Sequence, residues 1–300
     1  MAPRPAPALI HVSEEVATAL ADRRAVVALE TTLVAHGFPA PEGVEVGLES
    51  ERRVRAAGAV PATVGVLDGA IRVGLSESDL ECFTLDARKL GPRDLAVCAV
   101  QGAVGATTVG GTLAVAYAVG IRFLGTGGLG GVHRGFPNPP DVSADLGELA
   151  RGQALVVSSG VKSILDVPAT VELLETLGVP VLGFQTATMP LFYSAHGGPP
   201  VSAQVETAGE AARLAAAHWT LRRASLLLCQ PPAESIEVEP LIEEGIAAAT
   251  RAGVTGQGVT PFVLSYLHEH SGGETLRVNR ELIAANAGLA AEVATGYSSL

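Results

Sequence analysis

Lysine is nearly missing from this sequence. The 300 residues include 20 lysines and arginines, and only two of these are lysines, Lys89 and Lys162. Arginine can replace lysine wherever a positive charge on a long side chain is enough, but a guanidinium stays protonated and cannot act as a nucleophile. A chain that uses arginine almost everywhere else suggests that the amine of Lys162 reacts with a substrate. The alternative is chance composition, and other residues must decide between the two.

Aromatic residues and net positive charge are also scarce. Aromatic side chains make up 4% of the chain, and the formal net charge is −11. Phosphate backbones are bound by clustered cations and single strands by aromatic platforms, so we expect no nucleic-acid partner. A small anionic ligand held locally is compatible with this balance.

Cysteine is rare and shows no metal-binding spacing. Cys82, Cys98 and Cys229 form no C-x-x-C pair, which argues against a zinc site. Cys98 and Cys229 lie in apolar runs and are expected in the core. The N-terminal segment 1–15 contains no long apolar run or cleavage pattern, so we predict no signal peptide and a cytoplasmic protein.

One uncharged segment is long enough to cross a membrane. It runs from Leu95 to Ile121 and contains Gln101 and several glycines. These residues favour a buried strand, a turn and a helix of small residues over a membrane span. We therefore expect no membrane association.

Apolar strand patterns alternate with amphipathic helix patterns along the whole chain. Strands are expected at Ala25–Leu29, Leu95–Val100, Arg122–Leu124, Ala154–Ser158, Val179–Phe184 and Ser225–Cys229, and a hairpin within Ala62–Val73 turning at Asp68-Gly69. Helices are expected at Val12–Asp22, Val44–Ala57, Ser76–Cys82, from Thr108 to Gly120, Ala144–Arg151, from Asp166 onward, Ala208–Trp219, Pro240–Arg251, Pro261–His270 and Asn279–Ala294. The fold class is α/β, a single domain over residues 1–300 with a mostly parallel sheet between two helix layers.

A glycine-rich segment follows one of these strands. Gly125-x-Gly127-x-x-Gly130 matches the dinucleotide-binding fingerprint, but no helix begins after it and no acidic residue closes a following strand. A close approach of the backbone to a substrate, or a nest of amide groups for an anion, is the better interpretation.

Several polar residues stand where an α/β fold places ligands. Glu30 ends a buried strand, where a carboxylate either caps local structure or acts chemically. Asp141 and Asp145 either cap a helix or hold a hard cation. His133 and its neighbour Arg134 either bind phosphate or lie in a solvated loop. Asn279 and Asn286 are seven residues apart and share one helix face. Because asparagine is a poor helix former, they are expected to be buried amides that need partners, and a ligand contact is one way to supply these partners.

Eight separated motifs resemble one family in the same order. They are VVALETTLVAHG (26–37), GAVPATVG (58–65), GATTV (105–109), TGGLGGVHRG (126–135), DVSADL (141–146), KSILD (162–166), GVPVLGFQT (178–186) and TPFVL (260–264). Together they resemble the pseudouridine-5′-phosphate glycosidases, which include the indigoidine synthase A-like proteins. The resemblance covers residues 12–294.

The resemblance implies an enzyme that reversibly cleaves the C–C glycosidic bond of pseudouridine 5′-phosphate to uracil and ribose 5-phosphate. It also implies a divalent metal, typically Mn²⁺, and a homotrimer. Lys162 is implied as the nucleophile that forms an imine with the opened sugar, Glu30 as the general acid and Asp141 as the metal ligand. The residues implied to bind substrate are Lys89, Val109, Ser143, Ala144, Asp145, Thr126, His133 and Asn286.

Some positions depart from the family pattern. Thr31 replaces a common serine, Ala285 replaces the first of two asparagines, and Gln230 replaces an asparagine before proline. Gln204 and Glu206 stand where an Arg-x-Asp is usual. These differences concern fine substrate contacts. Two other functions compete with the implied one: a Schiff-base lyase of aldolase type acting on another phosphosugar, and a sugar-phosphate binding protein without catalysis.

Overall fold

The computed structural model describes residues 9–138, 140–221 and 224–300. Within these ranges one eleven-stranded sheet runs in the order β1-β4-β3-β2-β7-β9-β13-β11-β12, and β5 joins it through β6, which pairs with β3. Its strands are β1 (Ile10–Val12), β2 (Val26–Glu30), β3 (Val60–Leu67), β4 (Ala70–Val73), β5 (Arg88–Leu90), β6 (Gly105–Thr107), β7 (Phe123–Gly125), β9 (Leu155–Ser158), β11 (Val181–Phe184), β12 (Ala203–Val205) and β13 (Leu226–Cys229).

Most neighbouring strands are parallel. The antiparallel pairs among the described strands of this sheet are β3 with β4 and β3 with β6. A separate antiparallel pair joins β8 (Val132–His133) to β10 (Leu165–Asp166). The mostly parallel sheet predicted from the apolar strand runs is therefore confirmed.

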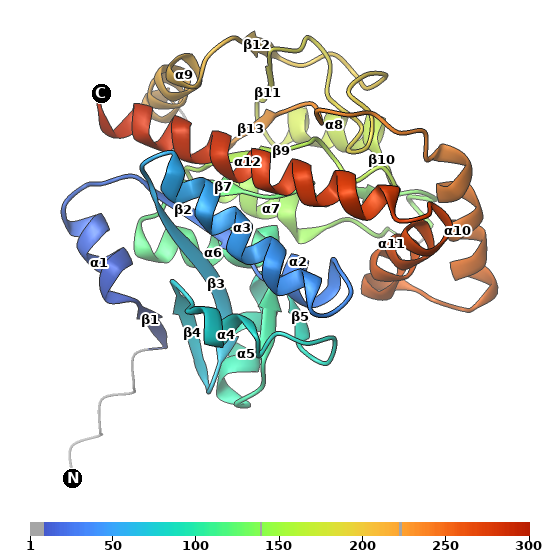
Figure 1. Ribbon diagram of the computed structural model, residues 1–300. Helices are drawn as coiled ribbons and strands as arrows, with labels where there is room; N and C mark the ends of the chain where they lie inside the picture. Colours follow the sequence, from blue (N-terminus) through green and yellow to red (C-terminus); the bar gives the residue numbers. More distant parts are fainter. Residues whose placement is uncertain (1–8, 139, 222–223) are drawn as a thin grey trace.

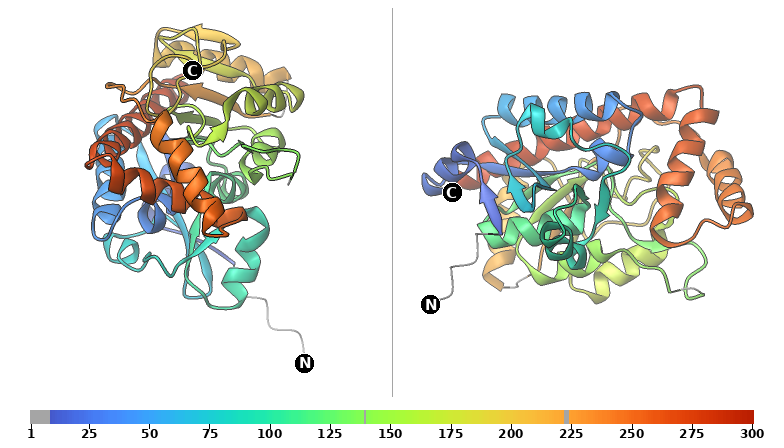
Figure 2. Two further views of the ribbon diagram at one scale, coloured as in Figure 1. Left: turned by 90° about the vertical axis from the view of Figure 1, so that its right-hand side faces the viewer. Right: turned by 90° about the horizontal axis from the view of Figure 1, so that it is seen from below.

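Helices cover both faces of the sheet (Figures 1 and 2). They are α1 (Glu14–Ala21), α2 (Thr32–His36), α3 (Glu42–Ala56), α4 (Glu77–Leu80), α5 (Leu95–Val100), α6 (Val109–Val119), α7 (Ala144–Arg151), α8 (Val167–Thr176), α9 (Ala208–Leu221), α10 (Glu239–Arg251), α11 (Val259–His270) and α12 (Glu274–Ser298), with short 3₁₀ turns at Pro92–Asp94 and Gly256–Gly258. The long helix α12 packs beside α3 and α9 on one face, and α6 and α7 lie on the other.

The central strands supply both apolar layers. In β2, which is buried throughout, Val27 and Leu29 pack with α12 while Val26 and Ala28 belong to the core on the opposite face. This alternation follows from the two-residue period of a strand. A strand with apolar residues on both faces must lie inside the sheet, which explains its central position.

The segment Leu95–Val100 was predicted as a buried strand, and this prediction is wrong. It forms α5, in which Leu95, Cys98 and Ala99 are buried while Val97 and Val100 are 54% and 83% exposed. Burial at positions i, i+3 and i+4 follows the period of a helix. In a short run in which every residue is apolar, the sequence alone does not distinguish a helix from a buried strand. The hairpin prediction is confirmed, since Asp68 and Gly69 join β3 to β4 with positive φ angles of 50° and 75°.

Two further expectations concern the termini and membranes. Across the described ranges, no helix combines the length and apolar character needed to cross a membrane. The prediction of no signal peptide rests largely on residues 1–8, which lie outside the described residues. The three cysteines are free, and Cys98 and Cys229 are buried as expected.

Candidate active site

The carboxyl ends of three adjacent strands bring the predicted catalytic residues together. Parallel strands β2, β7 and β9 are aligned so that Leu29 lies beside Gly125, and Gly125 beside Val157. Glu30 is the last residue of β2, Thr126 follows β7, and Lys162 lies four residues after β9. Because parallel strands end at one edge of the sheet, residues far apart in sequence meet there.

Glu30 is held rigidly and kept away from water. It is 5% exposed, and its Oε1 accepts a hydrogen bond from the hydroxyl of Thr126. The next residue, Thr31, anchors the strand end by donating to the carbonyl of Val64 at 2.8 Å and accepting the backbone N–H of Thr107 at 2.9 Å. Burial raises the pKa of the Glu30 carboxyl above its ordinary value, while Lys162 and Thr126 oppose the shift. A carboxyl with a raised pKa is suited to donating a proton near neutral pH.

The loop after β7 positions the loop that carries Lys162. The N–H of Ser159 donates to the carbonyl of Gly127 at 2.8 Å, the N–H of Leu129 to that of Gly160 at 2.9 Å, and the N–H of Lys162 to that of Leu129 at 3.1 Å. This pairing continues the contact between β7 and β9 beyond the strands. The backbone of Lys162 is therefore fixed by the glycine-rich segment.

The glycines of this segment are required by packing. A Cβ at Gly125 would lie 2.8 Å from the Cα of Ala287 on α12, and one at Gly130 would lie 2.6 Å from Oδ2 of Asp145. Such distances are shorter than real Cβ contacts. The match to a dinucleotide fingerprint thus reflects a close approach to α12 and to Asp145, and the strand β8 follows where that fingerprint needs a helix.

Asn286, on α12, binds the glycine-rich segment after β7 through its side-chain amide. Its Nδ2 donates to the carbonyl of Thr126 at 2.8 Å and to Oγ of Ser159 at 3.1 Å, with a longer contact to the carbonyl of Gly127 at 3.4 Å. The side chain is fully buried. Asn286 therefore ties the loop after β7 to the loop after β9, next to the residues that line the pocket.

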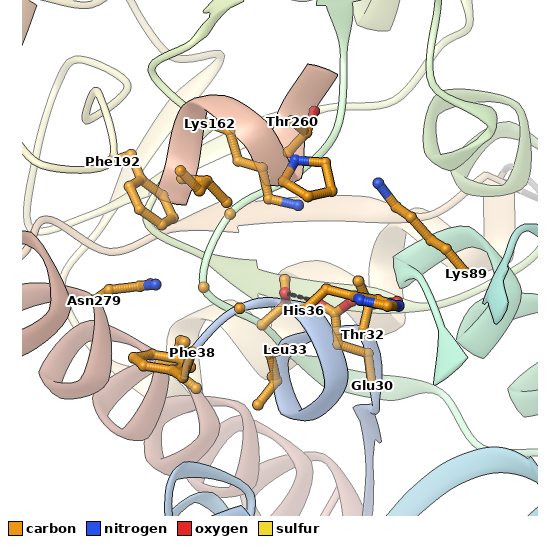
Figure 3. Close-up of a pocket in the computed structure, with 17 residues that line it drawn as sticks. Glu30, Thr32, Leu33, His36, Phe38, Lys89, Lys162, Phe192, Thr260 and Asn279 are labelled. Carbon is orange, nitrogen blue, oxygen red and sulfur yellow. Dashed lines mark hydrogen bonds between the residues drawn. The ribbon is translucent and has the colours of Figure 1, made fainter. Parts of the chain in front are cut away.

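The two lysines face the same cavity (Figure 3). Lys89 lies on β5, which the pairing with β6 carries toward the end of β2. Burial lowers the pKa of Lys89 to about 8, and the charge of Lys162 contributes to this shift. Lys89 is thus cationic at neutral pH but close to losing its proton.

Asp141 and Asp145 differ in environment. Asp145 is 4% exposed, and its two carboxylate oxygens accept the backbone N–H groups of Gly110 at 2.7 Å and Gly130 at 2.9 Å. Asp141 is half-buried, and its Oδ2 lies 3.8 Å from Nδ1 of His133. Burial lowers the pKa of His133, so its ring is neutral at neutral pH. Asp145 therefore clamps two glycine backbones, while Asp141 keeps its carboxylate available.

The cavity has a polar lobe and an apolar lobe that share a common border. The polar lobe, about 360 Å³, lies beside Lys89, His133, Asp141, Asp145 and the first residues of α6 and α7. Val109 begins α6, while Ser143 caps α7 and Ala144 begins it. Both helices point their N-termini at this lobe, and such termini favour anions.

The apolar lobe, about 50 Å³, is lined mainly by residues to which no role was assigned from the sequence. Its lining includes Leu33, His36, Phe38, Phe192, Leu264 and Ile283, together with Thr126 and Asn279 (Figure 3). Several of these residues lie in the motifs VVALETTLVAHG and TPFVL, so the sequence motifs could have indicated them. Phe192 lies in none of the motifs, and no sequence feature indicated it. The border shared by both lobes consists of Glu30, Thr32, Lys89, Lys162 and Thr260.

The donor atoms fit a weakly coordinated divalent cation and no closed metal cage. No group of three His, Cys, Asp or Glu side chains suited to a metal occurs among the described residues. Asp141 offers one free carboxylate at the polar lobe, with His133 beside it. Magnesium and similar ions commonly bind through one or two carboxylates, waters and substrate phosphates. Asp141 with a phosphorylated substrate matches that pattern.

Comparison with known proteins agrees with this architecture. The model of the family "Indigoidine synthase A like protein" matches residues 15–296. A pseudouridine-5′-phosphate glycosidase of Chloroflexus aurantiacus is 46% identical, covering 97% of this chain and all of the relative. One of Streptomyces griseus is also 46% identical, covering 94% of this chain and 90% of the relative.

Solved structures share the whole fold. The prealnumycin C-glycosynthase AlnA, in complex with ribulose 5-phosphate, has a TM-score of 0.87 and 38% identity, covering 98% of each chain. An indigoidine synthase A-like protein of Thermotoga maritima has a TM-score of 0.88 and 34% identity, covering 99% of each chain. Both the sequence and the fold place this chain in the indigoidine synthase A-like protein family.

Proposed function

We propose that this protein is a pseudouridine-5′-phosphate glycosidase that reversibly cleaves pseudouridine 5′-phosphate to uracil and ribose 5-phosphate. Relatives at 46% identity over nearly the whole chain carry that name. AlnA was solved with ribulose 5-phosphate, which supports a pentose phosphate as the sugar component.

The observation that carries the proposal is the border between the two lobes. The substrate joins an anionic sugar phosphate to a planar base, and the cavity joins a polar lobe to an apolar one. Glu30, Lys89 and Lys162 stand on the border, where the bond between sugar and base would lie. A substrate spanning both lobes would present its C–C bond to these groups.

The polar lobe suits the phosphate end. The N-termini of α6 and α7 and the charge of Lys89 all favour an anion there. A cation bound to Asp141 would add positive charge beside the phosphate. Ser143, Ala144, Val109 and His133 border the same lobe and would contact the sugar phosphate.

Lys162 and Glu30 would divide the chemistry. In the cleavage direction, the amine of Lys162 attacks C1 of the sugar and the bond between C1 and the ring oxygen breaks. Glu30 gives its proton to the ring oxygen and takes one from the nitrogen of Lys162. The nitrogen lone pair then forms a C=N bond as the electron pair of the C1–C5 bond passes to the uracil ring, and Glu30 gives its proton to C5. Water then hydrolyses the imine, which frees Lys162 and ribose 5-phosphate. Lysine amines form such imines with carbonyl carbons and thereby supply an electron sink.

The test is synthesis from uracil and ribose 5-phosphate, with and without Mn²⁺, followed by chromatography for pseudouridine 5′-phosphate. We expect product formation that chelation prevents and that reverses when pure product is supplied. Imine formation without any product from uracil would instead support a lyase acting on another phosphosugar. Binding of ribose 5-phosphate with neither imine nor product would support a binding protein.

The family resemblance also supports a homotrimer in the cytoplasm. Light scattering of the purified protein tests the assembly, and a mass of one or two chains would contradict it.

A further inference from the structure

A second cavity lies beside the loop that carries Lys162. It has a volume of about 190 Å³ and lies between the segment after β13 and one face of α12, so we call it the β13–α12 cavity. Among the described residues, it shares no lining residue with the polar lobe or the apolar lobe, so it is separate from the proposed substrate site. Its lining includes Ser159, Gln230 and Glu234, together with Glu281 and Asn286 of α12.

Asn286 leaves one oxygen available to this cavity. The side chain is fully buried, and its Nδ2 donates to the carbonyls of Thr126 at 2.8 Å and Gly127 at 3.4 Å. Carbonyl groups only accept hydrogen bonds, so these contacts fix which end of the amide carries the nitrogen. Oδ1 has no hydrogen-bond partner among the described residues. A buried acceptor of this kind usually has a partner outside the chain, such as a water or an ion.

Gln230 brings a second oxygen of the same kind. Its Oε1 is buried and has no partner within the described part of the chain. Its backbone N–H donates to the carbonyl of Ser158 at 2.8 Å, which fixes the residue beside the end of β9. The hydroxyl oxygen of Ser159 accepts a hydrogen bond from Nδ2 of Asn286 at 3.1 Å and keeps a second lone pair. Three segments of the chain therefore bring oxygen atoms to one cavity.

Acidic side chains surround the entrance of the cavity. Glu234 and Glu281 line it, and their side chains are each 53% exposed. Both carboxylates pair with Arg277, at 2.9 Å and 3.3 Å, and Glu274 pairs with the same guanidinium at 2.7 Å. Three negative charges thus share one positive charge, which leaves a net charge of −2. Such a local field concentrates cations.

The kinds of oxygen in the cavity favour a monovalent cation. Carbonyl oxygens replace the hydration shell of K⁺ in the proteins that select this ion. Ca²⁺ and Mg²⁺ instead draw on carboxylates, and the carboxylates of Glu234 and Glu281 are already paired with Arg277. A single water needs about 10–15 Å³. A cavity of about 190 Å³ therefore holds one ion together with several waters that complete its coordination.

We propose that the β13–α12 cavity binds a monovalent cation of the size of K⁺ through Oδ1 of Asn286 and Oε1 of Gln230, with Ser159, water and the nearby carboxylates completing the site. The ion joins α12 to the loops that follow β9 and β13. Ser159 lies three residues before Lys162. The ion therefore acts on Lys162 only through the position of its loop, and it touches no substrate.

The first test is thermal unfolding in KCl and in tetramethylammonium chloride at equal concentration, with a chelator present to remove divalent ions. We expect the Tm of wild type to be about 2 °C or more higher in KCl, as for a site near tenfold saturation in a chain of this size. Gln230→Leu removes one oxygen ligand at similar size and should lose the difference between the salts, and Glu281→Gln should reduce it. Glu292→Gln makes the same charge change at an exposed position of α12 outside the cavity. It is the matched control and should keep the difference.

Crystallography locates the ion, and it remains decisive if Gln230→Leu does not fold. Rb⁺ is close to K⁺ in size and scatters X-rays anomalously. Crystals of wild type grown with RbCl should therefore show an anomalous peak within coordination distance of Oδ1 of Asn286 and Oε1 of Gln230, whereas a cavity that holds only water gives none. Borohydride trapping of ribose 5-phosphate on Lys162 reports on the loop, and it should slow severalfold when tetramethylammonium replaces K⁺.

The ion site can be tested independently of the proposed function, because neither unfolding nor diffraction requires turnover. An absent Rb⁺ peak, or equal Tm values of wild type in the two salts, overturns the proposal. A Tm difference that persists unchanged in Gln230→Leu places the ion elsewhere, and a gain in Tm from Ca²⁺ without chelator but none from K⁺ makes the site divalent. Either of these results also overturns it. An occupied site with equal trapping rates in both salts overturns only the effect on Lys162.

Discussion

The hydroxyl of Thr126, just after β7, donates a hydrogen bond to Oε1 of Glu30 at the end of β2. The bond joins two adjacent parallel strands where they meet the cavity. It favours the ionised carboxylate and partly offsets the increase in pKa caused by burial. The pKa of Glu30 therefore reflects two opposing effects: burial raises it, and the hydroxyl of Thr126 and the nearby lysines lower it.

Changes at Glu30 and Thr126 should affect proton transfer differently. Glu30→Gln should lower turnover by about 10²–10⁴-fold, the usual scale for a general acid. A general acid acts while protonated, so activity should fall as pH rises through the raised pKa of Glu30. Thr126→Val removes the hydrogen bond that favours the carboxylate, and the alkaline limb of the kcat profile should move to higher pH. An unmoved limb would show that Thr126 does not tune the acid.

Lys162→Arg should abolish turnover while leaving the fold intact. Arginine keeps the charge and approximate reach but provides no neutral amine. Borohydride with ribose 5-phosphate should attach the reduced sugar to wild type and to Lys89→Arg, but not to Lys162→Arg. Peptide mass spectrometry locates the adduct. Attachment at Lys89 would reverse the roles of the two lysines. The comparison is informative because burial lowers the pKa of Lys89 to about 8, so part of its amine is neutral under the assay conditions.

Lys89 should make phosphate binding dependent on pH. Its pKa of about 8 means that the positive charge is present below pH 8 and is lost above it. The KM for ribose 5-phosphate should therefore rise as pH increases through about 8. Lys89→Arg stays charged throughout this range, so the inflection should vanish. An inflection of equal size in the variant would assign it to another group.

Asp141→Ala should remove metal-dependent activity without affecting stability. Asp141 is half-buried, and among the described residues no backbone N–H donates to its carboxylate as two do to that of Asp145. Isothermal titration with Mn²⁺ in the presence of ribose 5-phosphate should show binding to wild type and none to the variant. Full activity of Asp141→Ala in the presence of a chelator would refute the assignment.

Asp145→Ala should instead destabilise the fold. The substitution leaves the buried N–H groups of Gly110 and Gly130 without acceptors, at a cost of about 1–3 kcal/mol each. Denaturant unfolding should show a lower midpoint than that of Asp141→Ala. Equal midpoints for the two variants would mean that Asp145 is not a structural clamp.

The strand-end residues of the site could be predicted from sequence because a parallel sheet places its carboxyl ends at one edge. Glu30, Thr126 and Lys162 each lie at, or a few residues beyond, the end of a segment that was correctly predicted as a strand. The apolar lobe was not predictable in the same way. Phe192 lies in an irregular loop, and α2, α11 and α12 reach the lobe only through tertiary packing.

One wrong prediction and two features that the sequence left open have equally local causes. Leu95–Val100 is short and apolar, so its period was ambiguous, and only the exposure of Val97 and Val100 reveals a helix. Lys89 lies on a three-residue strand that pairing with β6 positions. Such a strand is too short to show a pattern. Asp141 and Asp145 looked equivalent by spacing, and their different environments depend on which backbone groups surround them.

The position of α12 has a consequence for how the protein is made. This helix is the last described element, yet it carries Asn279 and Ile283 at the apolar lobe, and Asn286 against the loop that positions Lys162. On the ribosome, every strand of the sheet emerges before residue 274 does. A nascent chain can therefore carry Glu30, Lys89 and Lys162 for much of its synthesis without a complete cavity, and premature termination before α12 yields a product that contains Lys162 but lacks the helix that lines the cavity and holds its loops.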